Sequence, residues 1–543
     1  MQPAPARRSP RGPLLAMLVA VTAVYAVAIP AGFIEFDDRW LIAESPFLRD
    51  ASPGALWRAW TALDPRTRLV LGAEYLPVRD TVAWCLARVG GPSPALFHAA
   101  QLGVYLAAVT LVRSWLRAVW PGPWRAELAA WLFALHPAHV PSVAWAAGLK
   151  DALSLLFMAA ALRAYAREGR RHAATVAALT ALACLSKGTS VALPALLLAG
   201  DLLAARTPRW RAVAASALVA VASVGLQAKV GASVHMFAEP LGRNAFERVA
   251  SMAPVPLRYL AVSSLLEAPC MVRVVPARAA LDPVALLSLT ALALMTFASA
   301  RRWRSGDRVP AAALALFFAG LAPVSQVFAP LQNRMADRYL LVAVLGPCVF
   351  AADLIARAPR PALRALLAGA VALLAAALSA RHAWEFADAD RLWRDAMTRA
   401  PESALAPYQL ALSEESRGRY AAAVALYRES LRRDALRSDL SPRAATNLSR
   451  LLAVSGRADE AESLLRGVIA RFPAHPRPIN NLATLRYARG DRDEARALFL
   501  RLVRDFPEYP RGRAGYVARF GEPPGPTPRS RPEDPWRIDL HAR

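Results

Sequence analysis

Repeated long apolar segments are the feature that most constrains what this chain can fold into. An α-helix needs about 20 apolar residues to cross a bilayer, and fewer where protein shields its ends. The sequence therefore predicts an all-α protein in which residues 1–381 form a polytopic membrane bundle. We expect about eleven spans, near residues 13–31, 96–117, 126–138, 151–166, 173–186, 189–204, 211–228, 283–300, 309–323, 339–356 and 365–381.

The first apolar segment follows a basic start, as in a secretory signal peptide. Because so many spans follow it, we expect an uncleaved first helix instead.

Arginine is concentrated in alternate loops of this predicted bundle. With eleven spans, all of these loops fall on one side, which the positive-inside rule makes the cytoplasm. This topology accounts for the net charge of +25, so no nucleic-acid partner is expected. The loops contain Arg7, Arg8, Arg11, Arg113, Arg117, Arg125, the segment 167–172, Arg206, Arg209, Arg211, the segment 301–308, Arg357, Arg360 and Arg364.

The opposite loops, 32–76, 229–282 and 324–338, are then extracytoplasmic, as is everything after residue 381. For a bacterial chain this means a multi-pass inner-membrane protein with a cytoplasmic N-terminus and a periplasmic C-terminal region. An apolar piece near 254–266 is expected to be a helix on the membrane surface.

A different pattern begins at residue 382. The segments 447–473 and 481–507 align with a shift of 34 residues, which pairs Gly456 with Gly490 and Ala461 with Ala495. This is the tetratricopeptide (TPR) spacing, with Gly at the turn and a small residue where the two helices touch. An earlier unit contains Gly418 and Ala423. We therefore expect a TPR solenoid over 382–520 that binds protein, and a Pro-rich, disordered tail over 521–543.

Ionisable and aromatic residues collect at the outer ends of the predicted spans. Ionisable groups at the edge of the hydrocarbon are costly and usually line a functional cavity. All three lysines of the chain are on this side, and a compact ammonium suits contact with a phosphate. The candidates are Asp37, Asp38, Tyr75, Arg79, His136, His139, Lys150, Lys187, Asp337, Arg338 and Tyr339.

Each candidate also has an ordinary structural explanation. His136 and His139 could pack at a helix interface, and they lack the third ligand that a metal site requires. Lys150 and Asp151 could form an ion pair at a helix end. The Asp37–Asp38 pair could be solvated loop acids or a helix cap, and residues 336–339 could cap the tenth span.

The stretches "FDDRW", "LFALHPAHVPSVAWAAGLKD", "LSKGTSVALP" and "MADRYL", followed by TPR units, together resemble one known family. They are similar to the multi-span glycosyltransferases with C-terminal TPR arrays, which belong to the GT-C class. Animal members are O-mannosyltransferases of the endoplasmic reticulum. The family's Tyr-Arg-Pro-Leu motif reads "YLPV" here, and its Arg-Lys-Asp motif reads "GLKD". Its Ser-Lys-Glu or Ser-Lys-Pro motif reads "SKG".

The resemblance implies transfer of a sugar, mannose in the animal enzymes, from a polyprenyl phosphate to an extracytoplasmic hydroxyl. A carboxylate would act as general base; Asp38 is the preferred candidate, and Asp37 would orient the loop. Lys187, Arg338 and Lys150 would stabilise the leaving phosphate. The remaining substrate contacts would come from Tyr75, Arg79, His136, His139, Asp337 and Tyr339. No metal or other cofactor is expected, and the TPR array would bind the protein acceptor or a partner.

Two other functions are compatible with the sequence. A membrane-anchored TPR scaffold that has lost activity would explain the altered "YLPV" and "SKG" motifs. A transporter of lipid-linked sugars is disfavoured because it would show internal repeats and broken helices at the midplane.

The predicted topology can be tested with a tag at the C-terminus. We expect the tag on intact cells or spheroplasts to react with reagents that cannot cross the cytoplasmic membrane, because an odd number of spans follows a cytoplasmic N-terminus. A tag that is protected from such reagents, and that reacts only after the membrane is opened, would contradict the topology.

Overall fold

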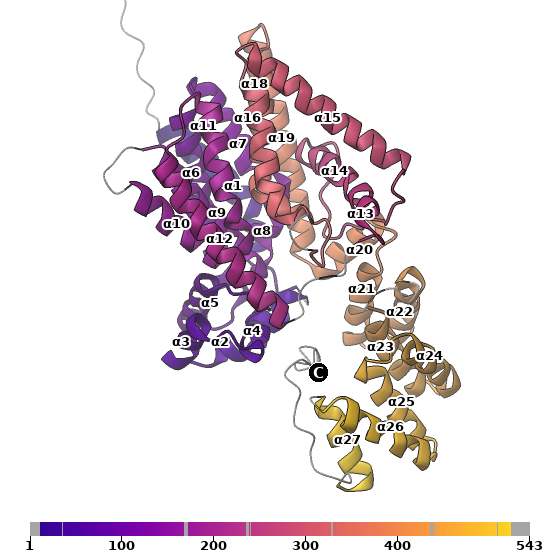
Figure 1. Ribbon diagram of the computed structural model, residues 1–543. Coiled ribbons are helices and arrows are strands. Elements are labelled where there is room, and N and C mark those ends of the chain that lie inside the picture. The colour runs from indigo at the N-terminus through magenta and orange to yellow at the C-terminus, as the bar shows by residue number, and fades with distance from the viewer. Residues whose placement is uncertain are drawn as a thin grey trace, which may run out of the picture. The chain divides into compact units, whose positions relative to one another are not determined.

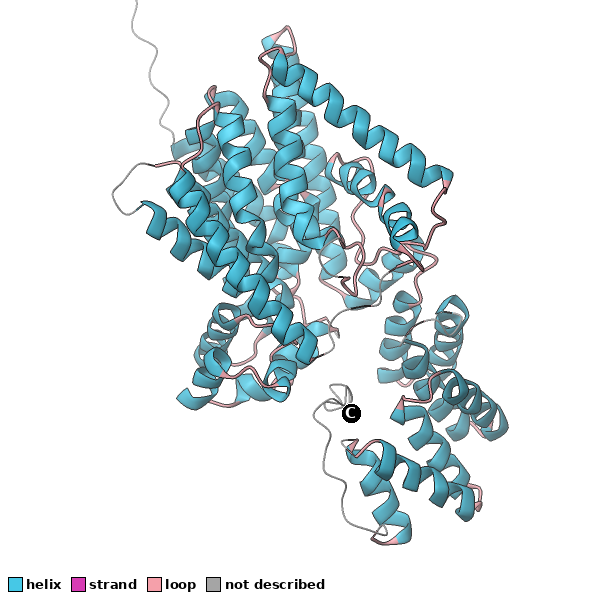
Figure 2. Cartoon of the chain, viewed as in Figure 1, coloured by secondary structure: helices cyan, strands magenta, loops and turns pink. Residues whose placement is uncertain are grey.

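The computed structural model describes residues 11–34, 36–167, 172–234, 238, 241–326, 330–434, 438, 440–507 and 509–522. Arg7, Arg8, residues 168–171 of the second arginine-rich loop and residues 523–543 of the predicted tail lie outside this part of the chain. Every regular element of the described residues is a helix (Figure 2), as the apolar periodicity predicts.

The chain divides into two compact units, Met1–Ala389 and Asp390–Arg543. The boundary predicted at residue 381 lies inside the last long helix of the first unit, α19 (Pro361–Phe386), and the structural division follows that helix.

Each predicted span lies on a helix of the first unit (Figure 1). Several of these helices begin with proline, which lacks the N–H that has no partner in the first turn. The helices are α1 (Arg11–Tyr25), α6 (Pro94–Val119), α7 (Pro123–Ala134), α9 (Leu149–Tyr165), α10 (His172–Ser186), α11 (Leu193–Ala204), α12 (Trp210–Ser233), α15 (Pro283–Arg304), α16 (Val309–Leu321), α18 (Leu345–Ala356) and α19.

By length and composition, four of the described helices could cross a membrane alone: α6, α12, α15 and α19. The number rises to six if two bent helix pairs, 137–165 and 337–356, each count as one span. The other predicted spans are shorter helices. The structure thus indicates a membrane protein with four to six candidate spans, and the count of eleven stays a prediction.

The first unit is held together by close helix packing. Helix α6 packs on α7 and α9, α10 packs on α9 and α12, and α16 packs on α11 and α18. Glycine permits the closest approach: a Cβ added to Gly320 of α16 would lie 2.7 Å from the Cα of Ala343. Small residues serve in this way wherever helices associate inside a bilayer.

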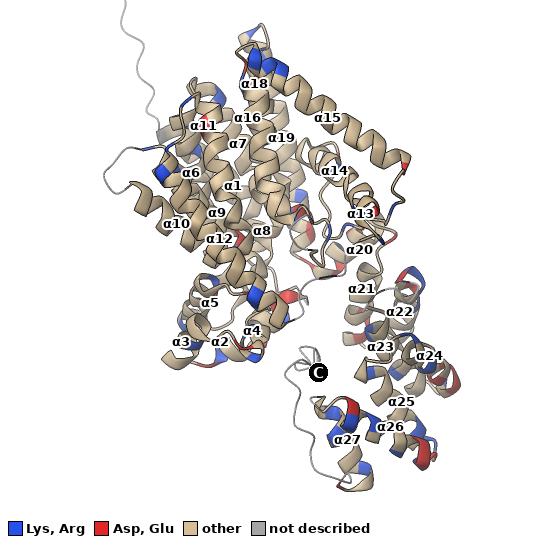
Figure 3. Ribbon diagram, in the orientation of Figure 1, with Lys and Arg blue, Asp and Glu red and all other residues tan. Residues whose placement is uncertain are grey.

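Three of the arginine-rich loops that the sequence assigns to one side contact one another: the loops before α7, before α16 and after α18. Arg125, before α7, pairs with Asp353 of α18 at 3.2 Å. Arg357 pairs with Asp307, before α16, at 2.7 Å. Figure 3 shows basic residues at this end, where α15 meets α18. The sequence places these loops on one side only through the assumed number of spans, whereas in the structure they are joined by ion pairs.

The loops at the other end contain short helices. The first loop forms η2 (Arg39–Ala43), α2 (Pro46–Arg49), α3 (Pro53–Thr61), α4 (Pro65–Val70) and α5 (Pro77–Gly90). Ser45, Ser52 and Asp64 cap α2, α3 and α4, each accepting a backbone N–H bond from three residues ahead. The second long loop forms α13 (Ala245–Met252) and α14 (Pro254–Ser263). The helix predicted near 254–266 is therefore present.

The second unit is a stack of helix pairs. Its helices are α20 (Ala389–Arg399), α21 (Leu405–Ser416), α22 (Tyr420–Asp434), α23 (Leu440–Val454), α24 (Ala458–Arg471), α25 (Pro476–Ala488), α26 (Arg492–Asp505) and α27 (Pro510–Phe520). Gly456 and Gly490 end the first helix of two successive pairs with φ of +77° and +88°. Ala461 and Ala495 are fully buried at the helix contact. The repeat spacing is confirmed.

We expect Gly346→Ala to lower the thermal stability of the purified protein. The new Cβ would lie 2.9 Å from the backbone nitrogen of Phe317 and closer still to the carbonyl oxygen of Ala313. Such overpacking costs about 1–3 kcal/mol. The control is Gly103→Ala in α6, where nothing lies within 4 Å of the new Cβ. Equal melting temperatures for the two variants would contradict the close α16–α18 contact.

Candidate functional site

Asp38 anchors the loop that follows α1. Its side chain is fully buried, and both carboxylate oxygens accept backbone hydrogen bonds, from the N–H of Ile34 at 3.0 Å and of Ala147 at 2.7 Å. Phe36 stacks on Trp145 with ring centroids 6.1 Å apart. Burial raises the pKa of Asp38 to about 7, although these hydrogen bonds oppose the shift. The residue fixes the loop against the segment before α9.

Asp37 has a different environment from its neighbour. It is only half-buried, and no ion pair joins it to another described residue. Burial raises its pKa; the charges of Lys150 and Arg338 oppose this shift, and the charge of Glu74 adds to it. A hydrogen bond from the side chain of Trp40 also lowers it. Asp37 is therefore a half-buried carboxylate that is held by Trp40 and lies within electrostatic reach of two cations.

Two lysines reach the same region from different elements. Lys150, in the first turn of α9, bonds to Glu74 at 2.5 Å. Lys187, in the turn after α10, is buried and bonds to Asp151, the residue next to Lys150. The first-turn position of Asp151 is favourable for a carboxylate, because the helix N-terminus is positive. Each lysine is thus held by one acid, which keeps the cations apart and fixed.

Arg338 is the third cation. Its guanidinium lies over the ring of Trp145 at 5.8 Å and over that of Tyr339 at 5.4 Å. It makes no ion pair with a described residue, and it influences the titration of both Asp37 and Lys187. Lys187, Arg338 and Tyr339 line one small cavity of about 20 Å³. A half-buried arginine without a carboxylate partner suits an anionic ligand.

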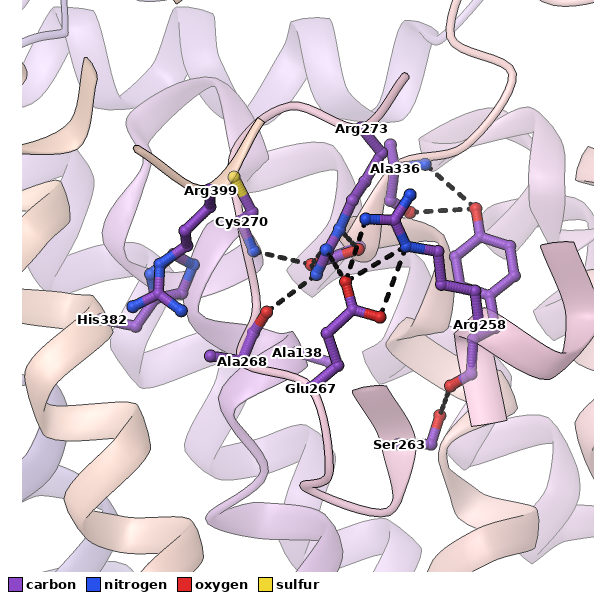
Figure 4. Close-up of polar contacts among 12 residues, drawn as sticks. Ala138, Arg258, Ser263, Glu267, Ala268, Cys270, Arg273, Ala336, His382 and Arg399 are labelled. Atoms are coloured by element: carbon purple, nitrogen blue, oxygen red, sulfur yellow. Dashed lines mark hydrogen bonds and ion pairs between the residues drawn. The ribbon is translucent and has the colours of Figure 1, made fainter. Parts of the chain in front are cut away.

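Asp337 points away from this cluster, although it is next to Arg338. It accepts hydrogen bonds from the guanidinium of Arg273 at 2.8 Å and from the backbone N–H of Cys270 at 2.7 Å. Figure 4 shows that Arg273 also donates to Glu267, which accepts a second hydrogen bond from the guanidinium of Arg258 at 3.1 Å. This buried network ties the long loop before α15 to the residues just before Arg338. Asp337 therefore has a positioning role in this structure.

Four other candidates are engaged in structural contacts. His136 interacts with the carbonyl of Ser263 at 3.0 Å, and His139 lies between Tyr105 and the carbonyl of Leu341. Tyr75 donates its hydroxyl to the carbonyl of Trp60, and Arg79 pairs with Asp80 at 2.7 Å. Both histidines therefore join different segments of the chain, which agrees with the structural explanation that they pack at a helix interface. Arg79 also influences Glu74 electrostatically, so it lies at the edge of the cluster.

The cluster therefore consists of Asp37, Glu74, Lys150, Asp151, Lys187, Arg338 and Tyr339, with Asp38 supporting the loop beneath it. The sequence gives no reason to choose Trp145, Glu267 or Arg273. Arg273 in particular lies in a loop with several arginines and no recurring motif. Only the fold pairs it with Asp337.

Comparison with known proteins identifies the repeat unit. A family model described as the tetratricopeptide repeat matches residues 452–516. No curated protein matches the chain. The match indicates protein–protein interaction for the second unit and leaves the polar cluster of the first unit to be interpreted from its chemistry.

We expect Asp38→Asn to destabilise the protein. An amide presents one N–H₂ group where the carboxylate accepted a backbone N–H, so a buried donor loses its acceptor at a cost of about 1–3 kcal/mol. The measurement is the melting temperature in detergent.

The matched control is Asp37→Asn, which makes the same chemical change at a half-buried residue and should leave the melting temperature unchanged. A larger loss of stability for the Asp37 variant would contradict the assigned roles.

Proposed function

We propose that this protein is a membrane glycosyltransferase that moves a sugar, such as mannose, from a polyprenyl phosphate to an extracytoplasmic hydroxyl. The observation that carries the proposal is that a half-buried carboxylate, Asp37, feels the charge of Arg338, a cation that forms no ion pair with a described residue. Transfer from a sugar phosphate needs a base for the attacking hydroxyl and cations for the developing phosphate charge.

Asp37 is the general base in this proposal. The sequence alone favours Asp38, but both oxygens of Asp38 are occupied by backbone N–H groups and its side chain is fully buried. A base must reach the proton it removes, and Asp37 is the more exposed of the two. Asp38 orients the loop that carries Asp37.

The phosphate would bind to Arg338, with Lys187 and Lys150 close by. Arginine contacts a phosphate with a planar fork, and its stacking on Trp145 and Tyr339 limits its motion. Lys187 and Lys150 are already neutralised by Asp151 and Glu74, so their main contribution is orientation and hydrogen bonding.

The lipid chain of the donor has space in the same unit. A cavity of about 740 Å³ lies among α14, α15, α16 and α18, with mostly apolar walls that include Leu260, Met295 and Phe317. His136 and Ser263 lie along it. The polar cluster does not line this cavity, so the proposal requires the chain to run between helices from the phosphate to the apolar space.

The proposal includes the eleven-span topology, with the polar cluster and the TPR array both outside the cytoplasm. In it, the TPR array holds the protein acceptor or a partner. The second candidate function is an inactive membrane-anchored scaffold. It is favoured by the departures "YLPV" and "SKG" from the motifs of the similar family.

We expect Asp37→Asn to lower the rate of sugar transfer about a hundredfold or more without altering stability, because the substitution removes the base. The assay uses reconstituted protein, polyprenyl phosphate sugar and an acceptor extract. The control is Asp50→Asn, the same change at an acid in the same loop that pairs with Arg58. Parental activity in the Asp37 variant would rule out its role as base.

The pH profile gives a second test of Asp37. A general base acts only when deprotonated, and burial raises the pKa of this carboxyl. The wild-type rate should therefore rise with pH up to that raised pKa and level off above it, and the rising limb should disappear in Asp37→Asn. Arg338→Ala should lower kcat at every pH, because the guanidinium stabilises the leaving phosphate. An active parent whose rate is flat across acidic pH would contradict the proposed base.

A further inference from the structure

The cavity of about 740 Å³ in the first unit has a polar end that the proposed function does not use. The cavity lies between α15 and the packed pair of α16 and α18 (Figure 1). Helix α15 lines it with Met295, Ala298, Ser299 and Arg302, which are spaced i, i+3, i+4 and i+7 and therefore share one face of the helix. The apolar part of this face thus ends at an arginine in the last turn of α15.

Most of α15 is not covered by protein. The structure describes the whole helix, and of its residues only Ala285 and Ser288, in the first two turns, are buried. The helix is long and apolar enough to cross a membrane. Water does not readily fill an apolar cavity. The hydrocarbon of a lipid is therefore the occupant that the apolar walls beside α15 fit.

Three arginines and two acids meet at the polar end of this cavity. Arg302 and Arg357 line the cavity, and both donate to Asp307, at 2.8 Å and 2.7 Å. Arg357 also donates to Asp353 at 2.7 Å, and Arg125 lies 3.2 Å from the same carboxylate. Three cations against two carboxylates leave one positive charge, which matches the single negative charge of a phosphodiester. The side chains of Arg302 and Arg357 remain 55% and 40% exposed, so a ligand can still reach them.

Asp353 provides a second, independent indication of a ligand. It lines the cavity and is only 2% exposed. Its Oδ1 accepts no hydrogen bond from the described residues, although the guanidinium of Arg125 lies 3.2 Å away. A buried acceptor without a donor is costly, so such atoms usually have a partner. The ligand that suits this end therefore carries a hydroxyl donor as well as a negative charge.

We propose that this cavity binds one molecule of phosphatidylglycerol. The acyl chains fill the apolar space beside α15, the phosphodiester contacts Arg302 and Arg357, and the headgroup glycerol donates a hydroxyl to Asp353. Basic pockets between membrane helices are usual sites for anionic lipid headgroups. The donor of the proposed function has its phosphate at Arg338, so this headgroup site is a separate one. The inference does not rest on sugar transfer, because lipid binding alone tests it.

The test is a titration of the delipidated full-length protein in detergent, followed by native mass spectrometry. Phosphatidylglycerol is compared with phosphatidylethanol, which has the same charge and no hydroxyl, and with zwitterionic phosphatidylethanolamine, all with identical acyl chains. Phosphatidylglycerol should bind about fivefold or more tighter than either, because it alone supplies both the charge and the hydroxyl. Equal affinities for the three lipids would mean non-specific lipid on the protein surface and would overturn the proposal.

A pair of neighbouring arginines separates the site from general positive charge. Arg302→Gln should weaken binding of phosphatidylglycerol about fivefold and reduce its advantage over phosphatidylethanolamine. The matched control is Arg301→Gln, which removes the same charge from an exposed residue in the same turn that lies outside the cavity lining. The control should change the affinity by less than about twofold. Equal losses in the two variants would overturn the assigned headgroup contact.

The space for the acyl chains is tested on the same helix. Ala298→Trp places a large ring in the cavity and should abolish binding, whereas Leu294→Trp, at a residue that is 62% exposed and outside the lining, should not. Neither residue is buried, so both variants should fold. Equal binding by the two variants would overturn the cavity as the lipid site.

Two other ligands identify the source of the phosphate. Glycerol 1-phosphate, which has the headgroup without the chains, should not bind at concentrations that saturate the lipid site. Polyprenyl phosphate should bind without dependence on Arg302. Arg302-dependent binding of glycerol 1-phosphate as tight as that of the lipid would make a free phosphate the ligand. Arg302-dependent binding of polyprenyl phosphate that is tighter than that of phosphatidylglycerol would make the sugar carrier the ligand. Either result would overturn the proposal.

Discussion

The cost of burying charge controls the chemistry of the first unit. A charge removed from water must be paired or must serve a ligand, because an unpaired one costs several kcal/mol. The fold pairs Lys150 with Glu74, Lys187 with Asp151 and Arg273 with Asp337. Among the described residues, Asp37 and Arg338 form no such ion pair, although the charges of Lys150 and Arg338 both act on Asp37. This exception distinguishes a candidate site from a purely structural network.

Neighbouring residues in this cluster have opposite roles. Asp38 faces inward to backbone N–H groups while Asp37 faces the cations, and Asp337 faces Arg273 while Arg338 faces the aromatic rings. Consecutive residues in a short helical turn point in different directions, so one member of each pair can anchor the backbone that positions the other. A rigid support of this kind is what a catalytic group requires.

Ion pairs also join neighbouring helices in the TPR unit. Its second helices carry arginines with carboxylate partners, such as Arg466 of α24 with Glu494 of α26. In the solenoid, one sequence position repeats along one face, so a substitution that recurs every 34 residues builds a continuous surface.

The sequence by itself determined the helical class, the apolar segments and the TPR repeats. These features depend on local periodicity and spacing, which the sequence contains directly. It also identified the residues from which the polar cluster is drawn. It could not tell that Asp37 and Lys187 belong to the cluster, whereas Asp38 and His139 make structural contacts. Those distinctions depend on contacts such as Asp38 with Ala147 and Asp337 with Arg273, between residues far apart in the chain. Only the tertiary structure decided them, because burial and partner choice arise when distant segments pack together.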